Sequence, residues 1–189
     1  MRPGRPMQRR RILAWPLMAA VAALASAPAA AQGVDLVSLE VQRQDGWLTL
    51  DFNARLQLPR AVQDALERGI PVYFVAEAAV LRNRWYWRDE RMARVSRTWR
   101  LAYQPLTSSW RVGIGAIGQT YPTLSEALGA LTRLSGWRLV EQGALDPDSR
   151  HYVEFSFRLD ATQLPGPMQI GLTSQGDWTL RIDRTLRLE

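Results

Sequence analysis

The stretch LTLDFNARL, residues 48–56, decides the fold, because apolar and polar residues alternate along it without interruption. Alternation with a period of two places every second side chain on one side of a β-strand, so one face is buried and the other meets solvent. The same pattern recurs in residues 153–159 and 178–182. The sequence therefore predicts strands with one buried face, which is typical of antiparallel sheets.

A strand is also expected before this stretch. Val37, Leu39 and Val41 alternate with more polar residues, and Asp45-Gly46 lies between the two segments. An Asp-Gly pair favours the tight turns that connect neighbouring antiparallel strands. We therefore expect these first two strands to form a hairpin.

Three more strands are expected in the middle of the chain. They span residues 72–87, 91–103 and 110–116, with a turn at 88–90 between the first two. The third is the weakest, because Gly113 and Gly115 lower strand propensity.

Two short helices interrupt the strands. Thr123-Leu-Ser-Glu126 is a capping box, in which the two polar side chains satisfy free amide groups of the first turn. The helix that it starts should continue until Gly136, with one apolar face made by Leu124, Leu128 and Leu131. A second helix is expected over residues 59–68, ended by Gly69. The predicted fold is mainly β (α+β), an antiparallel β-sandwich or curved sheet with two short helices.

Residues 1–31 have the composition of a secretory signal peptide. A run of arginines at 9–11 precedes an apolar segment, 12–25, and small residues at 27–31 suit a signal peptidase. We expect cleavage near Ala31-Gln32, periplasmic localisation, and a single β-rich mature domain over residues 32–189. An uncleaved membrane anchor is the alternative, which Pro16, Ser26 and Pro28 disfavour.

The charge of the chain excludes some partners. Five of the 24 basic residues precede the cleavage site, which leaves 19 against 18 acids. A mature charge near +1 gives no basic footprint for nucleic acid. All the basic residues are arginine, so the run at 9–11 is weak support for twin-arginine export, and the general secretory route is expected. The absence of cysteine excludes disulfides and a lipid-modified amino terminus.

Few residues are candidates for catalysis. Gly113, Gly115 and Gly118 have the spacing of a dinucleotide-binding loop, but no helix start follows the third glycine, so we expect a glycine-loosened strand. His151 is the single histidine and is expected to be exposed at the start of a strand. Glu77 is flanked by alanines and is expected to pair with an arginine of a neighbouring strand.

Metal and cofactor sites are not expected. A zinc site needs several His or Cys ligands, which this chain lacks. Asp146 and Asp148 flank a proline and are expected to form a turn, although they could join His151 around a cation.

Basic and aromatic residues are interleaved between positions 82 and 100, which is the strongest candidate for a binding surface. The expected partner- or anion-binding residues are Arg82, Arg84, Trp85, Trp87, Arg94, Trp99 and Arg100. Guanidinium groups and indole rings are frequent in interfaces and in sites for anionic groups. We expect the four arginines to share one face of a hairpin. The alternative is a solvated sheet face with arginine stems over the tryptophans.

Several segments resemble one known family. They are LERGIPVYF at 66–74, RWYW at 84–87, LAYQPLT at 101–107, LD at 159–160, LPGPMQI at 164–170 and DW at 177–178. Taken together they are similar to an exported proteobacterial family called domain of unknown function 4390, over nearly all of the mature chain. The charged end, residues 180–189, departs from the tryptophans that the resemblance implies.

The resemblance implies an accessory role in envelope sensing, because genes of this family often lie beside an NtrY-like membrane sensor kinase and a ribosomal RNA methyltransferase. Our leading hypothesis is a non-enzymatic periplasmic binding or signalling accessory that contacts an envelope protein or an anionic lipid surface. The alternative is a periplasmic carrier of a hydrophobic or lipid-like ligand. A hydrolase that uses His151 or Glu77 is the third hypothesis.

Overall fold

The computed structural model describes residues 33–84, 89–164 and 180–188. Over this part of the chain, the mainly-β prediction with two short helices is confirmed. The strands are β1 (Gly33–Gln44), β2 (Trp47–Gln57), β3 (Val72–Arg82), β4 (Glu90–Gln104), β5 (Ser109–Ile114), β6 (Ile117–Tyr121), β7 (Arg133–Glu141), β8 (His151–Leu159) and β9 (Arg181–Arg187). The α-helices are α1 (Arg60–Glu67) and α2 (Leu124–Leu131).

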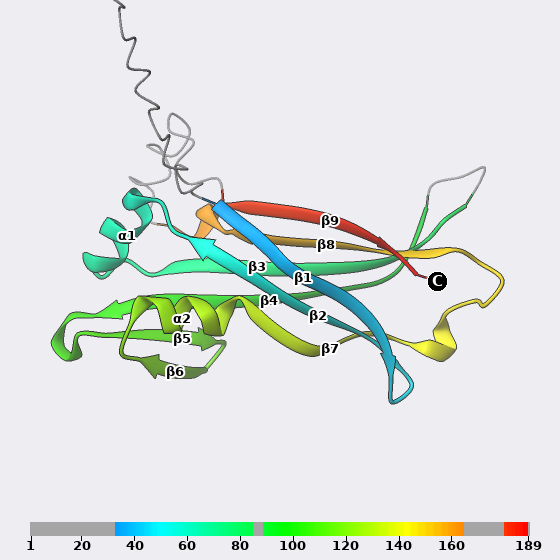
Figure 1. Ribbon diagram of the computed structural model, residues 1–189, viewed down its shortest axis with the longest axis horizontal. Helices are drawn as coiled ribbons and strands as arrows, with labels where there is room; N and C mark the ends of the chain where they lie inside the picture. The colour runs from blue at the N-terminus through cyan, green and yellow to red at the C-terminus, as the bar shows by residue number, and fades with distance from the viewer. Residues whose placement is uncertain (1–32, 85–88, 165–179, 189) are drawn as a thin grey trace, which may run out of the picture. The chain divides into compact units, whose positions relative to one another are not determined.

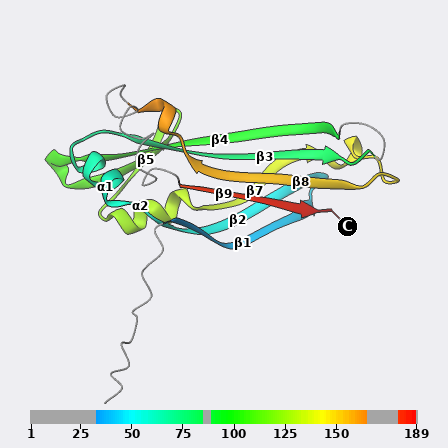
Figure 2. The same ribbon diagram turned by 90° about the horizontal axis from the view of Figure 1, so that it is seen from above.

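The strands form two antiparallel sheets. A three-stranded sheet has the order β1-β2-β7, and a six-stranded sheet has the order β6-β5-β4-β3-β8-β9. β1 and β2 lie in front of the larger sheet in Figure 1, and Figure 2 shows β3, β4 and β8 on one side and β1 and β2 on the other. The pairings β2·β7 and β3·β8 join strands that are far apart in the chain.

The space between the two sheets is filled with aromatic rings. Phe52 from β2 lies 5.1 Å from the ring centroid of Phe155 and 5.7 Å from that of Phe157, both on β8. Phe157 stacks on Phe74 at 5.8 Å, and Trp99 meets it edge-on at 6.2 Å. Burying a side chain of this size stabilises the fold by roughly 1.5–3 kcal/mol relative to leaving it in water. The face of each sheet that carries these rings is its inner face.

The predicted hairpin between the first two strands is confirmed. Asp45 and Gly46 have φ angles of 51° and 77°, the left-handed values that a two-residue turn of this kind needs. β1 contains one irregularity, because Leu36 pairs with Ala54 and Ser38 with Asn53. Val37, the extra residue between them, is 50% exposed as a result.

The glycines at 113–118 form a second hairpin instead of one strand through residue 116. β5 ends at Ile114, and Gly115, with φ at 58°, turns the chain into β6. The expectation that these glycines do not open a helix is confirmed, because α2 begins only at Leu124. The predicted strand was too long because a glycine with positive φ starts the turn before Ala116.

Both helices begin where they were predicted. In α1, Val62, Ala65 and Leu66 are buried, and Gly69 follows its end with φ at 81°. In α2, the Thr123 hydroxyl accepts a hydrogen bond from the Glu126 amide at 3.2 Å.

The predicted end of α2 was wrong. The helix stops at Leu131, and β7 begins at Arg133. Gly136, the expected helix end, lies inside β7 with φ at 62°, where its amide donates to Asp51 Oδ1 of β2 at 2.5 Å. The glycine is therefore needed for a bend in a strand. Trp178, at the start of the last predicted strand, lies outside the described residues.

Candidate functional site

The register of β3 and β4 divides the predicted arginine cluster between two faces. Arg100 pairs with Tyr73, and Arg94 pairs with Ala79, on the outer face of the six-stranded sheet. Arg82 is an even number of residues from Phe74 and therefore follows the inner face of β3. The expectation that the arginines share one face was wrong. The alternation along β3 is sufficient to place Arg82 on the inner face.

Three of the four arginines have a carboxylate partner. Arg82 and Arg84 both donate to Glu90, and these contacts, that of Arg82 first, lower the pKa of Glu90 below its ordinary value. Arg94 donates to Glu77 at 2.7 Å, so the expected pairing of Glu77 with an arginine of a neighbouring strand is confirmed. Exposed ion pairs of this kind add little to stability, and they occupy the charges that a partner would use.

The aromatic part of the predicted site does not form a surface platform in the described residues. Trp99 is only 3% exposed, because it belongs to the core between the sheets. Arg97 also follows the inner face, with its guanidinium carbon 5.8 Å from the ring centroid of Trp137 on β7. Trp85 and Trp87 lie outside the described residues.

A second arginine accompanies Arg100 on the outer face. Arg111 of β5 pairs with Ala102, and Gly113 of β5 pairs with Arg100, so the two arginines are diagonal neighbours. They border a hollow of about 250 Å³ whose lining includes Ala102, Gly113 and Gly118. We call this feature the arginine groove. Sequence reasoning missed it, because the β5–β6 hairpin was not predicted.

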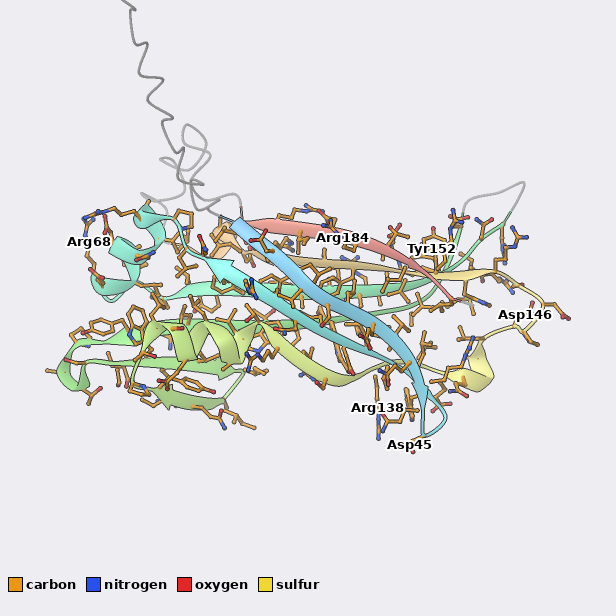
Figure 3. All side chains as sticks on the ribbon, in the orientation of Figure 1. Asp45, Arg68, Arg138, Asp146, Tyr152 and Arg184 are labelled. Atoms are coloured by element: carbon orange, nitrogen blue, oxygen red, sulfur yellow. The ribbon has the colours of Figure 1, made fainter. Side chains whose placement is uncertain are left out.

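The arginine groove lies toward one end of the molecule. Gly69, next to Arg68, contributes to its lining. Arg68 is labelled in Figure 3 at the end that carries α1, whereas Tyr152 and Asp146 are labelled toward the opposite end. The groove is therefore remote from the only histidine, which is next to Tyr152 in the chain.

His151 is buried, contrary to the expectation of an exposed strand end. Its side chain shares the inner face of β8 with Val153 and Phe155, and the residue is only 8% exposed. Nε2 has no hydrogen-bond partner among the described residues, and the residue pairs with Arg82 of β3. The alternation of β8 could have predicted this burial.

The loop before His151 forms the predicted turn. Asp146 accepts hydrogen bonds from the Asp148 amide at 3.1 Å and from the Ser149 hydroxyl at 2.8 Å. These contacts, that of Ser149 first, lower the pKa of Asp146. Arg82 Nη1 lies 3.7 Å from Asp146 Oδ2. The carboxylate therefore has a structural explanation that needs no cation.

Asp89, directly before β4, is held against β8 by a tyrosine. The Tyr152 hydroxyl donates to Asp89 Oδ2 at 2.5 Å, and the Arg84 amide donates to Asp89 Oδ1 at 3.2 Å. The hydrogen bond to Asp89 is the main cause that raises the pKa of Tyr152 to about 12, and it lowers the pKa of Asp89. This hydrogen bond has a structural role, because it connects the residue before β4 to β8 at the end of the sheet.

Two kinds of site are absent from residues 33–84, 89–164 and 180–188. No helix there has the length and apolar character needed to cross a bilayer. No three acidic or histidine side chains there are grouped as metal ligands.

Comparison with known proteins identifies the family of the chain. No curated protein and no solved structure matches the chain. The model of the family described as "Domain of unknown function (DUF4390)" matches residues 31–187. The chain therefore belongs to the DUF4390 family.

Proposed function

We propose that this protein is a non-enzymatic binding or signalling accessory of the bacterial envelope, exported to the periplasm by a cleaved signal peptide. Its partner is an envelope protein, for which an NtrY-like membrane sensor kinase is the first candidate. The outer face of the six-stranded sheet is the proposed contact surface. The observation that carries the proposal is the arginine groove, which joins two cationic side chains on that face.

The packing of the interior supports a surface site over an internal one. Phe52, Phe74, Phe155 and Phe157 occupy the space between the sheets, where a carrier would hold a hydrophobic ligand. A carrier is therefore the weaker alternative, because these aromatic side chains already pack against one another in the space that a hydrophobic ligand would need.

The surroundings of His151 support a role without hydrolysis. A general base needs hydrogen-bond reach to a substrate proton, and this imidazole lies on the inner face with Val153 and Phe155. Glu77 is already paired with Arg94 at the surface. Among the described residues, no nucleophile or carboxylate is hydrogen-bonded to His151 Nε2.

Affinity capture tests the proposal. The mature chain, residues 32–189, is immobilised and exposed to solubilised envelope from the native bacterium, and retained proteins are identified by mass spectrometry. We expect the sensor kinase or another envelope protein to be retained by the wild type and by Arg55→Gln, and to be depleted with Arg100→Gln/Arg111→Gln. Arg55 is exposed on the three-stranded sheet and serves as the charge-matched control.

Complementation with His151→Ala separates an accessory from an enzyme. The variant should restore the phenotype of a deletion strain, with circular dichroism as the check that it folds. His151→Gln is the second variant if the alanine form is unstable. Loss of the cellular role in a folded variant would argue for catalysis and against the proposal.

A further inference from the structure

We propose that the arginine groove binds a phosphate group, with Arg100 and Arg111 as its ligands. The assignment rests on the proposed binding role, because it names the chemical group that the surface recognises. It differs from the dinucleotide loop that the glycine spacing suggested, since the charge is supplied by two side chains and not by the start of a helix.

The register brings the two guanidinium groups within reach of one ligand. Arg100 lies on β4 opposite Gly113, and Arg111 lies two residues before Gly113 on β5. Diagonal neighbours of this kind are about 7–8 Å apart at their backbones, a gap that long side chains can bridge. Both side chains follow the outer face. Arg111 lies over Gly118 of β6, whose partner Gly113 is also the partner of Arg100, so the two guanidinium groups can meet one ligand over Gly113.

The glycines leave room for Arg111 to lie along the sheet. A methyl group built on Gly118 of β6 would lie 2.8 Å from Nε of Arg111, and one built on Gly113 would lie 3.2 Å from the carbonyl oxygen of Ile117. A side chain at position 118 would therefore displace the guanidinium. The floor of the groove has no side chain larger than a methyl group at Ala102, Gly113 and Gly118.

The charges of these two arginines are not used within the described structure. Arg82, Arg84 and Arg94 each have a carboxylate partner, as do Arg158 and Arg181. Among the described residues, none of the ion pairs includes Arg100 or Arg111, and the lining of the groove contains no Asp or Glu. Two neighbouring cations without an acid repel each other, and an anion between them removes that cost.

Phosphate is the anion that this arrangement fits best. A guanidinium group presents a planar fork of donors that matches two oxygens of a phosphate. A phosphate monoester carries about −1.5 to −2 charges at neutral pH, so two arginines neutralise it. The phosphate can come from a free ion or ester in solution or from a lipid headgroup, and the experiment distinguishes these sources.

Titration with inorganic phosphate tests the site directly. Chemical shifts of the Gly113 and Gly118 amides are followed in the mature protein at constant ionic strength. We expect saturable binding, weakened about tenfold in Arg100→Gln and in Arg111→Gln, since a hydrogen bond to a charged group is typically worth at least this factor. Arg55→Gln should bind as the wild type does.

A variant that keeps the charge tests the geometry. Gly118→Ala places a methyl group where Arg111 lies and should weaken phosphate binding without changing the net charge. Gly129→Ala on α2 is the matched control, because a methyl group there has nothing within 4 Å. Equal affinity in Gly118→Ala and Gly129→Ala would overturn the proposed position of the ligand.

Vesicles identify the source of the phosphate. Sedimentation with phosphatidic acid vesicles, compared with phosphatidylcholine vesicles, measures binding to an anionic headgroup that is a phosphate monoester. Arginine-dependent binding to the anionic vesicles alone assigns the site to lipid, and arginine-dependent binding of inorganic phosphate assigns it to soluble phosphate. If neither ligand binds, or if Arg55→Gln loses as much affinity as Arg111→Gln, the proposal is wrong. Capture of a partner by the wild type is measured separately and can succeed or fail independently.

Discussion

Tyr152 and Asp89 make the stability of the protein depend on pH at both ends of the scale. Asp89 has a lowered pKa, so its contribution is present above the ordinary value of 3.8 and is lost as the pH falls through the folded-state pKa. Tyr152 has a raised pKa, so its contribution is present below 10.0 and is lost as the pH rises toward about 12. Tyr152→Phe should remove the alkaline dependence and reduce the acid one, because the Arg84 amide still donates to Asp89 in the variant, as measured by urea unfolding across pH.

Tyr73→Phe is the control for this prediction, because Tyr73 is an outer-face tyrosine of β3 outside the Asp89 contact. The ultraviolet absorbance of tyrosinate gives a second measurement, in which the titration step that is lost in Tyr152→Phe should lie near pH 12. The absence of a late-titrating tyrosine would show that the hydroxyl is solvated and not bound to Asp89.

The cap of α2 is the second point at which one side chain sets local stability. Thr123→Ala removes the acceptor for the Glu126 amide and should lower the free energy of unfolding by about 1 kcal/mol. Ser125→Ala, an exposed change in the first turn of the same helix, should have little effect. Urea unfolding monitored by fluorescence measures both variants. Equal stability of the two would contradict the capping role.

Local sequence patterns predicted where the strands and helices lie in the chain better than they predicted which strands pair. Alternation identified β2 and β8, and turn and cap residues identified the β1–β2 hairpin and the starts of both helices. The same alternation placed Arg82 and His151 on the inner face, although we expected otherwise. The missed arginine groove depends on the β5–β6 hairpin, where glycines at 113, 115 and 118 remove the apolar pattern that marks a strand.

Pairings between distant strands are the part that local patterns do not contain. β7 joins β2, and β8 joins β3, across long stretches of chain. Which strands become neighbours is determined by how the two sheets cover one core, and many strand orders satisfy the same alternation. The sequence therefore predicted a sandwich or a curved sheet, but not the pairings β2·β7 and β3·β8 that set the order of its strands.

Processing of the whole chain gives the third prediction. The native protein should begin near Gln32, because small residues follow the apolar segment of the signal. Mass spectrometry of protein isolated from the periplasm measures the mature mass. A mass that retains residues 1–31 would support the membrane anchor instead.

The position of β6 at the edge of the six-stranded sheet has a consequence for exchange of amide protons with solvent. Among the described residues, β3 is paired on both sides, whereas the five residues of β6 pair with β5 alone. Short edge strands open locally at a lower free energy than central ones, so protection should decrease from β3 toward β6. Gly118, in the floor of the groove, belongs to this edge strand. A ligand bound there would stabilise the closed state of β6 and slow the exchange of its amide protons. Ligand binding would then be detected as slower amide exchange at this edge, without a change in the shape of the sheet.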